Sequence, residues 1–505
     1  MTSRTSSICK VDYVKSKATI YRSNFGRGVD SSGKEIVNQM NEPLKFKLFS
    51  VYGQILHKKV LEDAWKHVKA NKGCGGIDKI SIKDFEKDCD RNLEEILEEL
   101  KTKTYKPSPV ARKYIPKKNG KLRPLGIPTI KDRIVQQAVV SKLQPFFEEK
   151  VFHDNSCGFR ANREVELAIK KVLCRIEYGY LYIYDFDIKG YFDNIPHKKL
   201  MKVLNKYVSD GTILDLIWKW LKAGYMEDNI RYGQTKGIMQ GGVISPLLAN
   251  IYLNELDWEL DKAGLQFVRY ADDSIVMCKS KEQLIKAKEV VHDVLTRLGL
   301  ELAEDKTDEI DFHNDDFDFL NFTFKHMTRS KKGNLYYRIV PSEKSIKKFK
   351  SEMKALIPKS STMSFEQWKE KLNPIIRGKY NYFLISARAC LAVRNKLHEL
   401  GKRFHGYCFM DYSNLDGYIR HRLRVNFSCR GKKNGGQAKG KLLTIKYGNE
   451  FFMKDMRLVN GRYLFNKVYY PNMTVEEFIE KGKHKNRKKS YDCNKDIFFS
   501  YAYVQ

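Results

Sequence analysis

The sequence lacks the marks of a disulfide-stabilised, zinc-binding or membrane protein. Its 10 cysteines are scattered from Cys9 to Cys493, and none belongs to a Cys-x-x-Cys pair. This spacing argues against a zinc site or a dithiol redox motif, and reduced thiols in a cytoplasm account for it most simply. No signal peptide, internal repeat or apolar run long enough to cross a bilayer is apparent. We therefore expect a cytoplasmic protein that does not act in a membrane.

Acidic residues are few relative to basic ones. The 505 residues include 61 Asp and Glu against 93 Lys and Arg, which gives a formal net charge of +32. Positive charge spread along a chain in this way predicts a polyanion partner such as RNA or DNA. A basic soluble protein without such a partner is the alternative. The length allows about two to four domains.

The most informative stretch covers residues 267–277. Two apolar, β-prone runs flank Tyr270-Ala271-Asp272-Asp273, a pattern that predicts a hairpin with two carboxylates at its turn. Adjacent carboxylates repel each other and are costly to desolvate, so a cation would stabilise them. Mg²⁺ prefers carboxylate oxygens. A solvated Asp-Asp turn is the alternative for this stretch taken alone.

Another acidic pair lies in a strand predicted over residues 180–188. A period of two places Ile183, Asp185 and Asp187 on one face, and acidic groups among apolar neighbours need a cation or a strong partner. An Asp on this strand and the later Asp pair can converge on one edge of a sheet. Such an arrangement suits in-line phosphoryl transfer with two metal ions.

A glycine-rich segment, residues 237–250, lies between these two stretches. Gly241 and Gly242 allow close approach of the backbone to a ligand. We expect Ser245 to be a helix N-cap and Pro246 the first helical residue.

Helical periodicity is clear elsewhere. It predicts a helix from near Phe49 to Asn71 and an amphipathic helix from Leu284 to Leu298 that ends near Gly299. The alternation of strands and helices along the chain predicts a mixed sheet backed by helices.

Residues 111–137 form a predicted basic hairpin. Asn119-Gly120 between two β-prone arms is a strong hairpin signal. Its arms and exit could hold a triphosphate or a template backbone, and a solvated basic hairpin is the alternative. The basic residues are Lys117, Lys118, Lys121, Arg123, Lys131 and Arg133.

Taken in order, five short blocks resemble the reverse transcriptases encoded by bacterial group II introns, over roughly residues 50–425. One block alone would be weak, but all of them in order are a specific signal. The resemblance implies an α+β right-hand polymerase in a bacterial cytoplasm, with fingers, a palm whose mixed or antiparallel sheet is backed by helices, and a helical thumb. The blocks are Leu122–Pro128, Ser156–Arg160, Asp187–Asp193, Gln240–Asn250 and Tyr270–Asp273.

The resemblance also implies a division into five regions. These are a basic N-terminal extension over 1–43, fingers over 44–175, a palm with the catalytic carboxylates over 176–325, a thumb or maturase-like RNA-binding region over 326–430, and a basic C-terminal segment over 431–505.

Catalytic roles follow from the same match. Asp187, rather than Asp185, matches the first metal-binding carboxylate of the family, and Asp272 and Asp273 match the other two. They would bind two Mg²⁺ ions, with Mn²⁺ as an alternative. Lys306 falls where the family has a lysine that protonates pyrophosphate, although a surface lysine is a nearly equal alternative.

Five further residues match substrate-binding positions. Lys121 and Arg123 match finger residues near the triphosphate, and Gln240 and Gly241 match the turn that touches the template–nucleotide pair. Phe192 matches the steric gate that excludes a ribose 2′-hydroxyl, so the product should be DNA.

Basic residues outside the palm are expected to bind RNA. They include Arg133 in the fingers and Arg377 in the thumb, together with Arg420 and Arg424, which share a helix face. The stretch Phe317–Phe324 resembles a family strand motif but has Asn321 where the family has glycine.

The C-terminal segment departs from many intron-encoded proteins. Residues 430–505 lack the paired cysteines and the His array of a His-Asn-His nuclease, so we expect no nuclease. A β-prone stretch covers 442–470 and a basic run follows at 481–489. Tyr501 and Tyr503 could supply a priming hydroxyl, or could pack as a final strand.

We therefore expect an RNA-directed DNA polymerase, a nucleotidyltransferase that uses dNTPs on a bound RNA template to make cDNA. We expect it to be encoded by a group II intron and to act as a maturase. One alternative is an antiviral defence enzyme that copies a dedicated noncoding RNA, with protein priming. Another is an RNA-binding splicing cofactor. An oligomer is compatible with the sequence.

Overall fold

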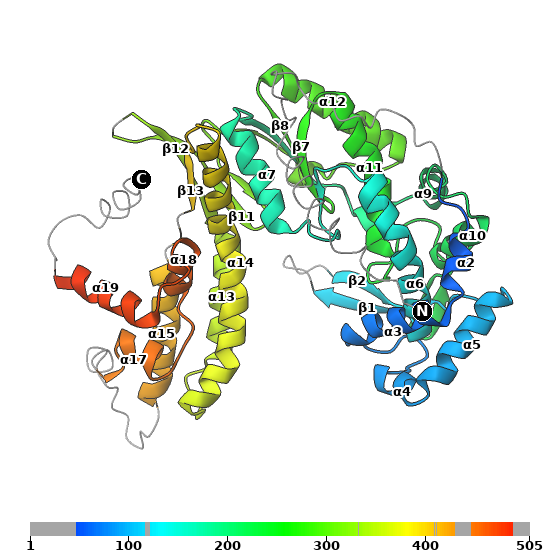
Figure 1. Cartoon of the computed structure of the whole chain (residues 1–505), viewed down its shortest axis with the longest axis horizontal. Coiled ribbons are helices and arrows are strands. Elements are labelled where there is room, and N and C mark those ends of the chain that lie inside the picture. The colour runs from blue at the N-terminus through cyan, green and yellow to red at the C-terminus, as the bar shows by residue number, and fades with distance from the viewer. Residues whose placement is uncertain are drawn as a thin grey trace, which may run out of the picture. The chain divides into compact units, whose positions relative to one another are not determined.

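The computed structural model divides into two compact units, Met1–Phe312 and His313–Gln505 (Figure 1). None of the described helices has the length and apolar character needed to span a bilayer. The structure describes residues 47–116, 122–331, 333–408, 410, 412–429 and 446–487.

A five-stranded mixed sheet forms the centre of the first unit, in the order β3-β7-β8-β4-β9. Only β3 and β7 pair in parallel, so the predicted mixed sheet is confirmed. The strands are β3 (Ser156–Cys157), β4 (Tyr182–Phe186), β7 (Gln266–Tyr270), β8 (Asp273–Cys278) and β9 (Asp308–Asp311).

Three helices pack on this sheet: α7 (Val165–Glu177), α11 (Ser245–Lys262) and α12 (Lys281–Leu298) (Figure 1). Val276 and Cys278 of β8 belong to the same apolar cluster as α11 and α12. The period of two turns their strand neighbours to the opposite face.

The predicted helix ending near Gly299 is confirmed as α12. Ser280 caps its start by accepting a hydrogen bond from the Gln283 amide, and Gly299 ends it with a φ of 72°. This left-handed C-cap is favourable for glycine because glycine has no Cβ.

A second, four-stranded sheet lies in the same unit, in the order β2-β1-β5-β6. The predicted basic hairpin is present as the antiparallel pair β1–β2, and its tip, 117–121, lies outside the described residues. The strands are β1 (Val110–Pro116), β2 (Leu122–Ile127), β5 (Tyr225–Glu227) and β6 (Ile230–Tyr232).

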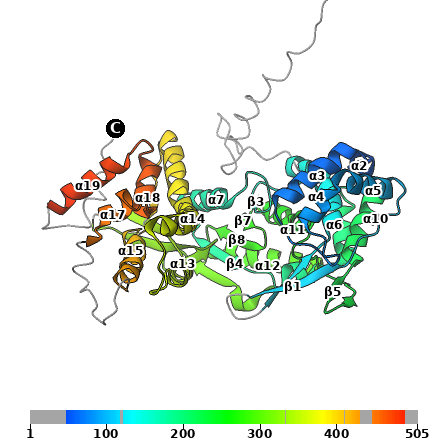
Figure 2. The same ribbon diagram turned by 90° about the horizontal axis from the view of Figure 1, so that it is seen from below.

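Helices pack together beside this second sheet, with α3, α4, α5 and α6 adjacent (Figure 2). The helix predicted near Phe49–Asn71 is divided in two, because Leu56 ends α2 and His57 takes an extended backbone. The elements are α2 (Val51–Ile55), α3 (Lys58–Ala70), α4 (Ile82–Lys87), α5 (Cys89–Lys101), α6 (Ile130–Phe146), η1 (Phe147–Val151), α8 (Tyr191–Asn194), α9 (His197–Leu204), α10 (Gly211–Lys222) and η2 (Glu304–Lys306).

The second unit combines a four-stranded sheet with helices. Its sheet order is β10-β11-β12-β13, and the expected palm boundary at residue 325 falls inside β11. The elements are β10 (Phe317–Phe319), β11 (Phe322–Arg329), β12 (Leu335–Pro341), β13 (Gly406–Cys408), α13 (Glu343–Leu356), α14 (Phe365–Glu399), α15 (Tyr412–Cys429), α17 (Asn449–Lys454), α18 (Gly461–Tyr469) and α19 (Val475–Arg487).

The turn between β10 and β11 explains the unusual Asn321. Phe319 pairs with Phe322, and the two intervening residues, Leu320 and Asn321, have φ values of 51° and 65°. A two-residue hairpin turn of this type needs left-handed backbone, which asparagine adopts more readily than most residues. Asn321 can therefore replace the glycine of the family motif.

The β-prone reading of residues 442–470 is wrong, because the described part of this stretch forms α17 and α18. The aromatic and apolar residues that suggested strands pack onto α14 and α15 in one buried cluster. Asn460 caps the start of α18. Asp416 of α15 accepts hydrogen bonds from the amides of Gly461 and Arg462 at 2.9 and 3.2 Å. Tertiary packing has thus overridden local propensity.

Candidate functional site

The three predicted catalytic carboxylates lie together where the interior strands β7, β8 and β4 of the five-stranded sheet begin or end. Tyr270 pairs with Asp273, so Ala271 and Asp272 form the hairpin turn between β7 and β8. The neighbouring strand β4 pairs with β8 as far as Phe186 opposite Ser274. Asp187 follows immediately, so antiparallel pairing places it beside the Asp272-Asp273 turn.

Repulsion between the carboxylates accompanies this proximity. Burial, followed by the charges of Asp272 and Asp187, raises the pKa of Asp273 to about 6, although its side chain keeps solvent access. Burial also raises the pKa of Asp272, and Asp187 adds to the rise while Arg123 opposes it. A site with this much negative charge would be stabilised by a cation.

Lys306 supplies positive charge at the same place. Its Nζ forms an ion pair with Asp187 Oδ2, and this hydrogen bond is the main cause of the raised pKa of Lys306. The Ala303 amide donates to the Asp187 carbonyl at 2.8 Å, which fixes the segment that carries Lys306. The described residues contain no preformed group of three or more His, Cys, Asp or Glu arranged to hold a metal ion.

The Gln240-Gly241 turn lies against β2. The Gly126 amide donates to the Gln240 carbonyl at 2.7 Å. Gly241 has a φ of 108°, and a Cβ there would lie 2.5 Å from the Gly126 carbonyl oxygen. This backbone approach excludes any side chain at position 241.

The segment after this turn is held by α6. Gln136 Oε1 accepts hydrogen bonds from the amides of Val243 and Ile244 at 2.9 and 3.4 Å. The expected N-cap role of Ser245 is wrong, because the N-cap is Ile244 and α11 begins at Ser245 itself. The Ser245 hydroxyl instead donates to the Met239 carbonyl at 2.7 Å and closes the loop.

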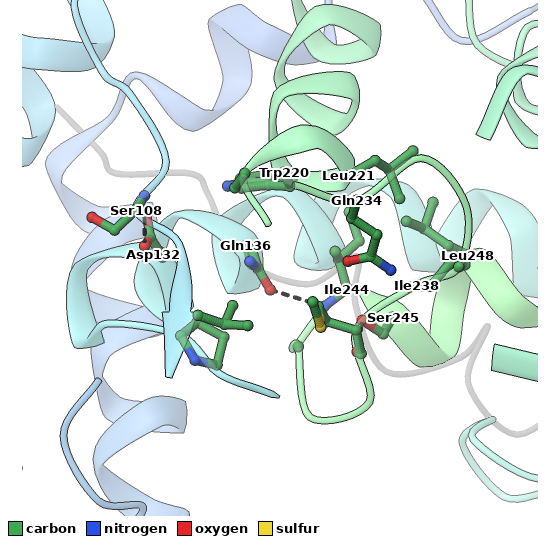
Figure 3. Close-up of a pocket in the computed structure, with 16 residues that line it drawn as sticks. Ser108, Asp132, Gln136, Trp220, Leu221, Gln234, Ile238, Ile244, Ser245 and Leu248 are labelled. Atoms are coloured by element: carbon green, nitrogen blue, oxygen red, sulfur yellow. Dashed lines mark hydrogen bonds between the residues drawn. The ribbon is translucent and has the colours of Figure 1, made fainter. Parts of the chain in front are cut away.

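A small cavity of about 30 Å³ lies behind this loop (Figure 3). Its lining includes Gln136, Trp220 and Ser245, and Asp132, which accepts a hydrogen bond from the Ser108 amide at 3.2 Å. A space of this size holds about two waters. The cavity is therefore too small for a nucleotide.

Phe192 and Arg123 also lie in the first unit. The ring of Phe192 is partly exposed and meets Phe159 edge-on at a centroid distance of 6.4 Å. The Ile238 amide donates to the Phe192 carbonyl at 2.7 Å, which joins this residue to the segment before Gln240. Arg123 is exposed on β2. Lys121, Tyr501 and Tyr503 lie outside the described residues.

The expected RNA-binding role of Arg133 needs correction. Its side chain is buried, and it donates from Nε to the Pro128 carbonyl at 2.9 Å and from Nη2 to the Cys74 carbonyl. A guanidinium bound to two backbone carbonyls inside the unit holds loops together and is not free for RNA.

The thumb arginines also differ from one another. Arg377 is exposed. Arg424 donates to the Tyr447 carbonyl at 2.9 Å and to Asn449 Oδ1 at 3.2 Å, so it joins α15 to the segment before α17. Arg420 is partly buried near Asp416, and burial lowers its pKa. Arg424 therefore makes contacts within its own unit, which corrects its expected RNA-binding role, whereas that role stays a prediction for Arg420.

Sequence reasoning missed three polar residues beside the Ala271-Asp272 turn: Asn250, Asp257 and Arg269, all of them buried. Two signals could have identified them. Arg269 lies inside an apolar strand, and Asn250 and Asp257 are seven residues apart on a mostly apolar helix, which places them on one face.

The fold and this carboxylate site define a right-hand nucleic-acid polymerase. Residues 115–324 match the family model "Reverse transcriptase (RNA-dependent DNA polymerase)", and residues 346–399 match "Group II intron, maturase-specific domain". Protein YkfC of Escherichia coli is 35% identical over 52% of this chain and 79% of its own length. The chain therefore belongs to the group II intron-type reverse transcriptases and maturases, which are RNA-directed DNA polymerases.

Two other similarities are more partial. The group II intron-encoded protein LtrA of Lactococcus lactis is 40% identical over 45% of this chain, but the match covers only 37% of LtrA. The solved telomerase from Candida tropicalis with a TWJ fragment of telomeric RNA aligns with a TM-score of 0.37 and 14% identity, over 68% of this chain and 64% of that one. A score this low adds nothing to the assignment.

Proposed function

We propose that this protein extends a primer with dNTPs on a bound RNA template, at the site formed by Asp187, Asp272 and Asp273. The observation that carries this proposal is the meeting of the three carboxylates at one sheet edge, beside Lys306, in a chain of this family.

The donor set fits hard divalent cations. The cluster accepts Mg²⁺ or Mn²⁺ well, because the ions relieve the repulsion that helps to raise the pKa values of Asp272 and Asp273, and carboxylate oxygen is their preferred ligand. Bound ions of this kind activate an attacking hydroxyl and stabilise a leaving pyrophosphate. Asp187 would share in holding such an ion, and in this structure its charge is balanced by Lys306.

Other residues of the chain bind and orient the substrates in this proposal. Arg123 contacts the triphosphate of the incoming nucleotide, and Phe192 excludes a 2′-hydroxyl. The Gln240-Gly241 turn supports the template–nucleotide pair through its backbone. Lys306, once released from Asp187, donates a proton to the pyrophosphate.

Primer extension on an RNA template tests the polymerase proposal. Asp272→Ala should lower the rate by at least about 10²–10³-fold. The variant loses a carboxylate that would hold the metal ions, and these ions would stabilise the charge of the transition state. Asp63→Ala, at an exposed carboxylate on α3, is the matched control and should be fully active. A fully active Asp272→Ala enzyme would contradict the proposal.

We further propose that the chain assists the splicing of its own intron RNA, on the basis of the maturase-specific match over residues 346–399. Asp272→Ala should keep this activity, since RNA folding does not need the carboxylates. Sequencing the RNA that copurifies with the protein from its host tests the partner. Spliced intron lariat supports the proposal, whereas a single short noncoding RNA would favour a dedicated cDNA-synthesis role.

A further inference from the structure

The catalytic turn rests on a buried arginine. Arg269 lies in β7, two residues before the turn, and its side chain is 1% exposed. Asp257 of α11, which is 0% exposed, accepts from Arg269 Nε at 2.7 Å and from Nη2 at 2.5 Å. This two-pronged geometry is the strong form of an arginine–carboxylate pair.

The remaining donors of Arg269 reach three other groups. Nη1 donates to Asn250 Oδ1 at 3.0 Å and to the Ala271 carbonyl at 2.8 Å. Nη2 donates to Ser156 Oγ at 2.6 Å. One guanidinium therefore joins α11, β3 and the turn that carries the two catalytic carboxylates.

The turn needs this support because of its backbone. Ala271 has a φ of 58°, a left-handed conformation that alanine seldom adopts. Its carbonyl is held by Arg269, and its amide donates to the Cys157 carbonyl at 3.0 Å. Both backbone polar groups of this strained residue are therefore hydrogen-bonded.

Asn250 connects Arg269 to the Cys157-Gly158 segment, whose Cys157 carbonyl accepts the hydrogen bond from the Ala271 amide. Its Nδ2 donates to the Gly158 carbonyl at 3.0 Å while its Oδ1 accepts from Arg269. Gly158 has a φ of 78°, and a Cβ there would lie 2.9 Å from the Ala271 amide nitrogen. Asn250 therefore couples the two contacts that hold Ala271.

We propose that Arg269 is a positioning residue for the polymerase, which with Asp257 and Asn250 holds Ala271 left-handed so that Asp272 and Asp273 stay beside Asp187. This inference rests on the proposed function, because it assigns the placement of the same metal-binding carboxylates. The competing interpretation is a buried ion pair that stabilises the core and has no effect on the site.

Arg269→Lys separates these interpretations. Lysine keeps the charge next to Asp257, but it cannot bond Asp257, Asn250 and the Ala271 carbonyl together. We expect kcat to fall by about 10²-fold, as for a small misplacement of catalytic groups, with little change in the KM for dNTP. Mn²⁺ binding, measured by electron paramagnetic resonance without turnover, should weaken by about 10-fold or more.

Two further variants keep the test decisive. Val291→Ala, in the α12 core and away from the turn, is the stability control and should lower the melting temperature without changing Mn²⁺ binding. Ala271→Gly combined with Arg269→Lys should recover part of the lost kcat relative to Arg269→Lys alone, because glycine adopts this φ without strain. A purely structural role predicts no such recovery.

The outcomes are distinguishable. If Arg269→Lys only lowers the melting temperature, as Val291→Ala does, the inference is overturned. If Arg269→Lys does not fold, Asn250→Ala takes its place, and unchanged kcat and Mn²⁺ binding in that variant would overturn the inference equally. Full activity in Asp272→Ala would instead remove the proposed function itself.

Discussion

At the scale of single residues, backbone conformation decides where the chemistry lies. Ala271 and Gly241 both have positive φ values, one at the carboxylate turn and the other at the turn against β2. The Ala271 carbonyl and amide are both hydrogen-bonded, and Gly241 lies close to the Gly126 carbonyl oxygen. Substitutions at such positions act through the main chain, so their effects can be separated from lost side-chain chemistry.

Gly241→Ala should disable the polymerase, since the added Cβ would meet the Gly126 carbonyl oxygen. We expect a loss of about 10²-fold in kcat/KM for dNTP, comparable to other small displacements at an active site. Gly264→Ala is the matched control, because Gly264 also has a positive φ but has open space around it. That control should cost about 1–2 kcal/mol of stability and leave primer extension unchanged. Equal activity in the two variants would exclude a steric role for Gly241.

Phe192→Val should relax the selection against ribonucleotides. A smaller side chain leaves room for a 2′-hydroxyl, and pocket contacts of this size are worth about 10- to 100-fold in discrimination. The measurement is the ratio of kcat/KM for dNTP to that for rNTP on one RNA template. An unchanged ratio in an otherwise active enzyme would show that another residue selects the sugar.

Burial of His197 makes the stability of the first unit depend on pH. Its ring is buried, Nε2 lies 2.7 Å from the Gly237 carbonyl, and Nδ1 has no hydrogen-bond partner within the described part of the chain. Burial lowers the pKa of His197 below 6.5; the hydrogen bond to Gly237 opposes this shift, and the charge of Lys222 adds to it. The unfolded chain therefore binds more protons, and stability should fall as the pH decreases through that value.

His197→Gln tests this dependence, because the glutamine amide can still donate to the Gly237 carbonyl. The free energy of unfolding of the natural protein should fall faster than that of the variant below pH 6.5, by up to about 1.4 kcal/mol per pH unit. Denaturant titrations at several pH values measure this difference. Parallel curves would show that His197 does not titrate differently on folding.

At the scale of elements, local signals predicted part of the fold and tertiary contacts determined the rest. The hairpins β1–β2 and β7–β8 and the helix α12 were readable because turn residues, alternation and caps all agreed. The described part of residues 442–470 was misread because aromatic residues have high strand propensity, whereas here they pack as helices against α14 and α15.

The candidate site was also predictable only in part from the sequence. The carboxylates were predictable because charged residues in apolar strands are rare and because their blocks resemble a family. The structural use of Arg133 and Arg424 was not predictable, since the carbonyl partners Cys74 and Tyr447 are far away in sequence. The residues of the Arg269 network carried sequence signals, but the contact of Arg269 with Ser156, 113 residues away, was not predictable.

Within the second unit, Asp416 of α15 joins α18 to α14. Besides the two amides at the start of α18, it accepts a hydrogen bond from the Tyr380 hydroxyl at 2.8 Å. Asp416→Ala leaves these buried donors unsatisfied, and we expect a loss of about 1–3 kcal/mol. Hydrogen exchange of α18 should accelerate, whereas exposed Asp455→Ala should leave it unchanged. Unaltered exchange in Asp416→Ala would mean that apolar packing alone holds α18.

At the scale of the whole molecule, a net charge of +32 makes nucleic-acid binding depend on salt. Each phosphate contact releases counterions, so the logarithm of the binding constant falls linearly with the logarithm of salt concentration. The slope of this line reports the number of phosphate contacts, which the total charge of the protein does not reveal. It can therefore distinguish arginines that face solvent from those used inside a unit.

Arg377 and Arg424 make this comparison within one helical unit. Arg377 is exposed, and Arg424 bonds the Tyr447 carbonyl and Asn449. On an RNA template–DNA primer duplex, Arg377→Gln should reduce the magnitude of the salt slope by about 1, as expected for one lost phosphate contact. Arg424→Gln removes the same formal charge but should leave the slope unchanged and lower the melting temperature. If the two variants shift the slope equally, the long-range electrostatic field of the protein determines its affinity for the duplex, and specific arginine–phosphate contacts do not.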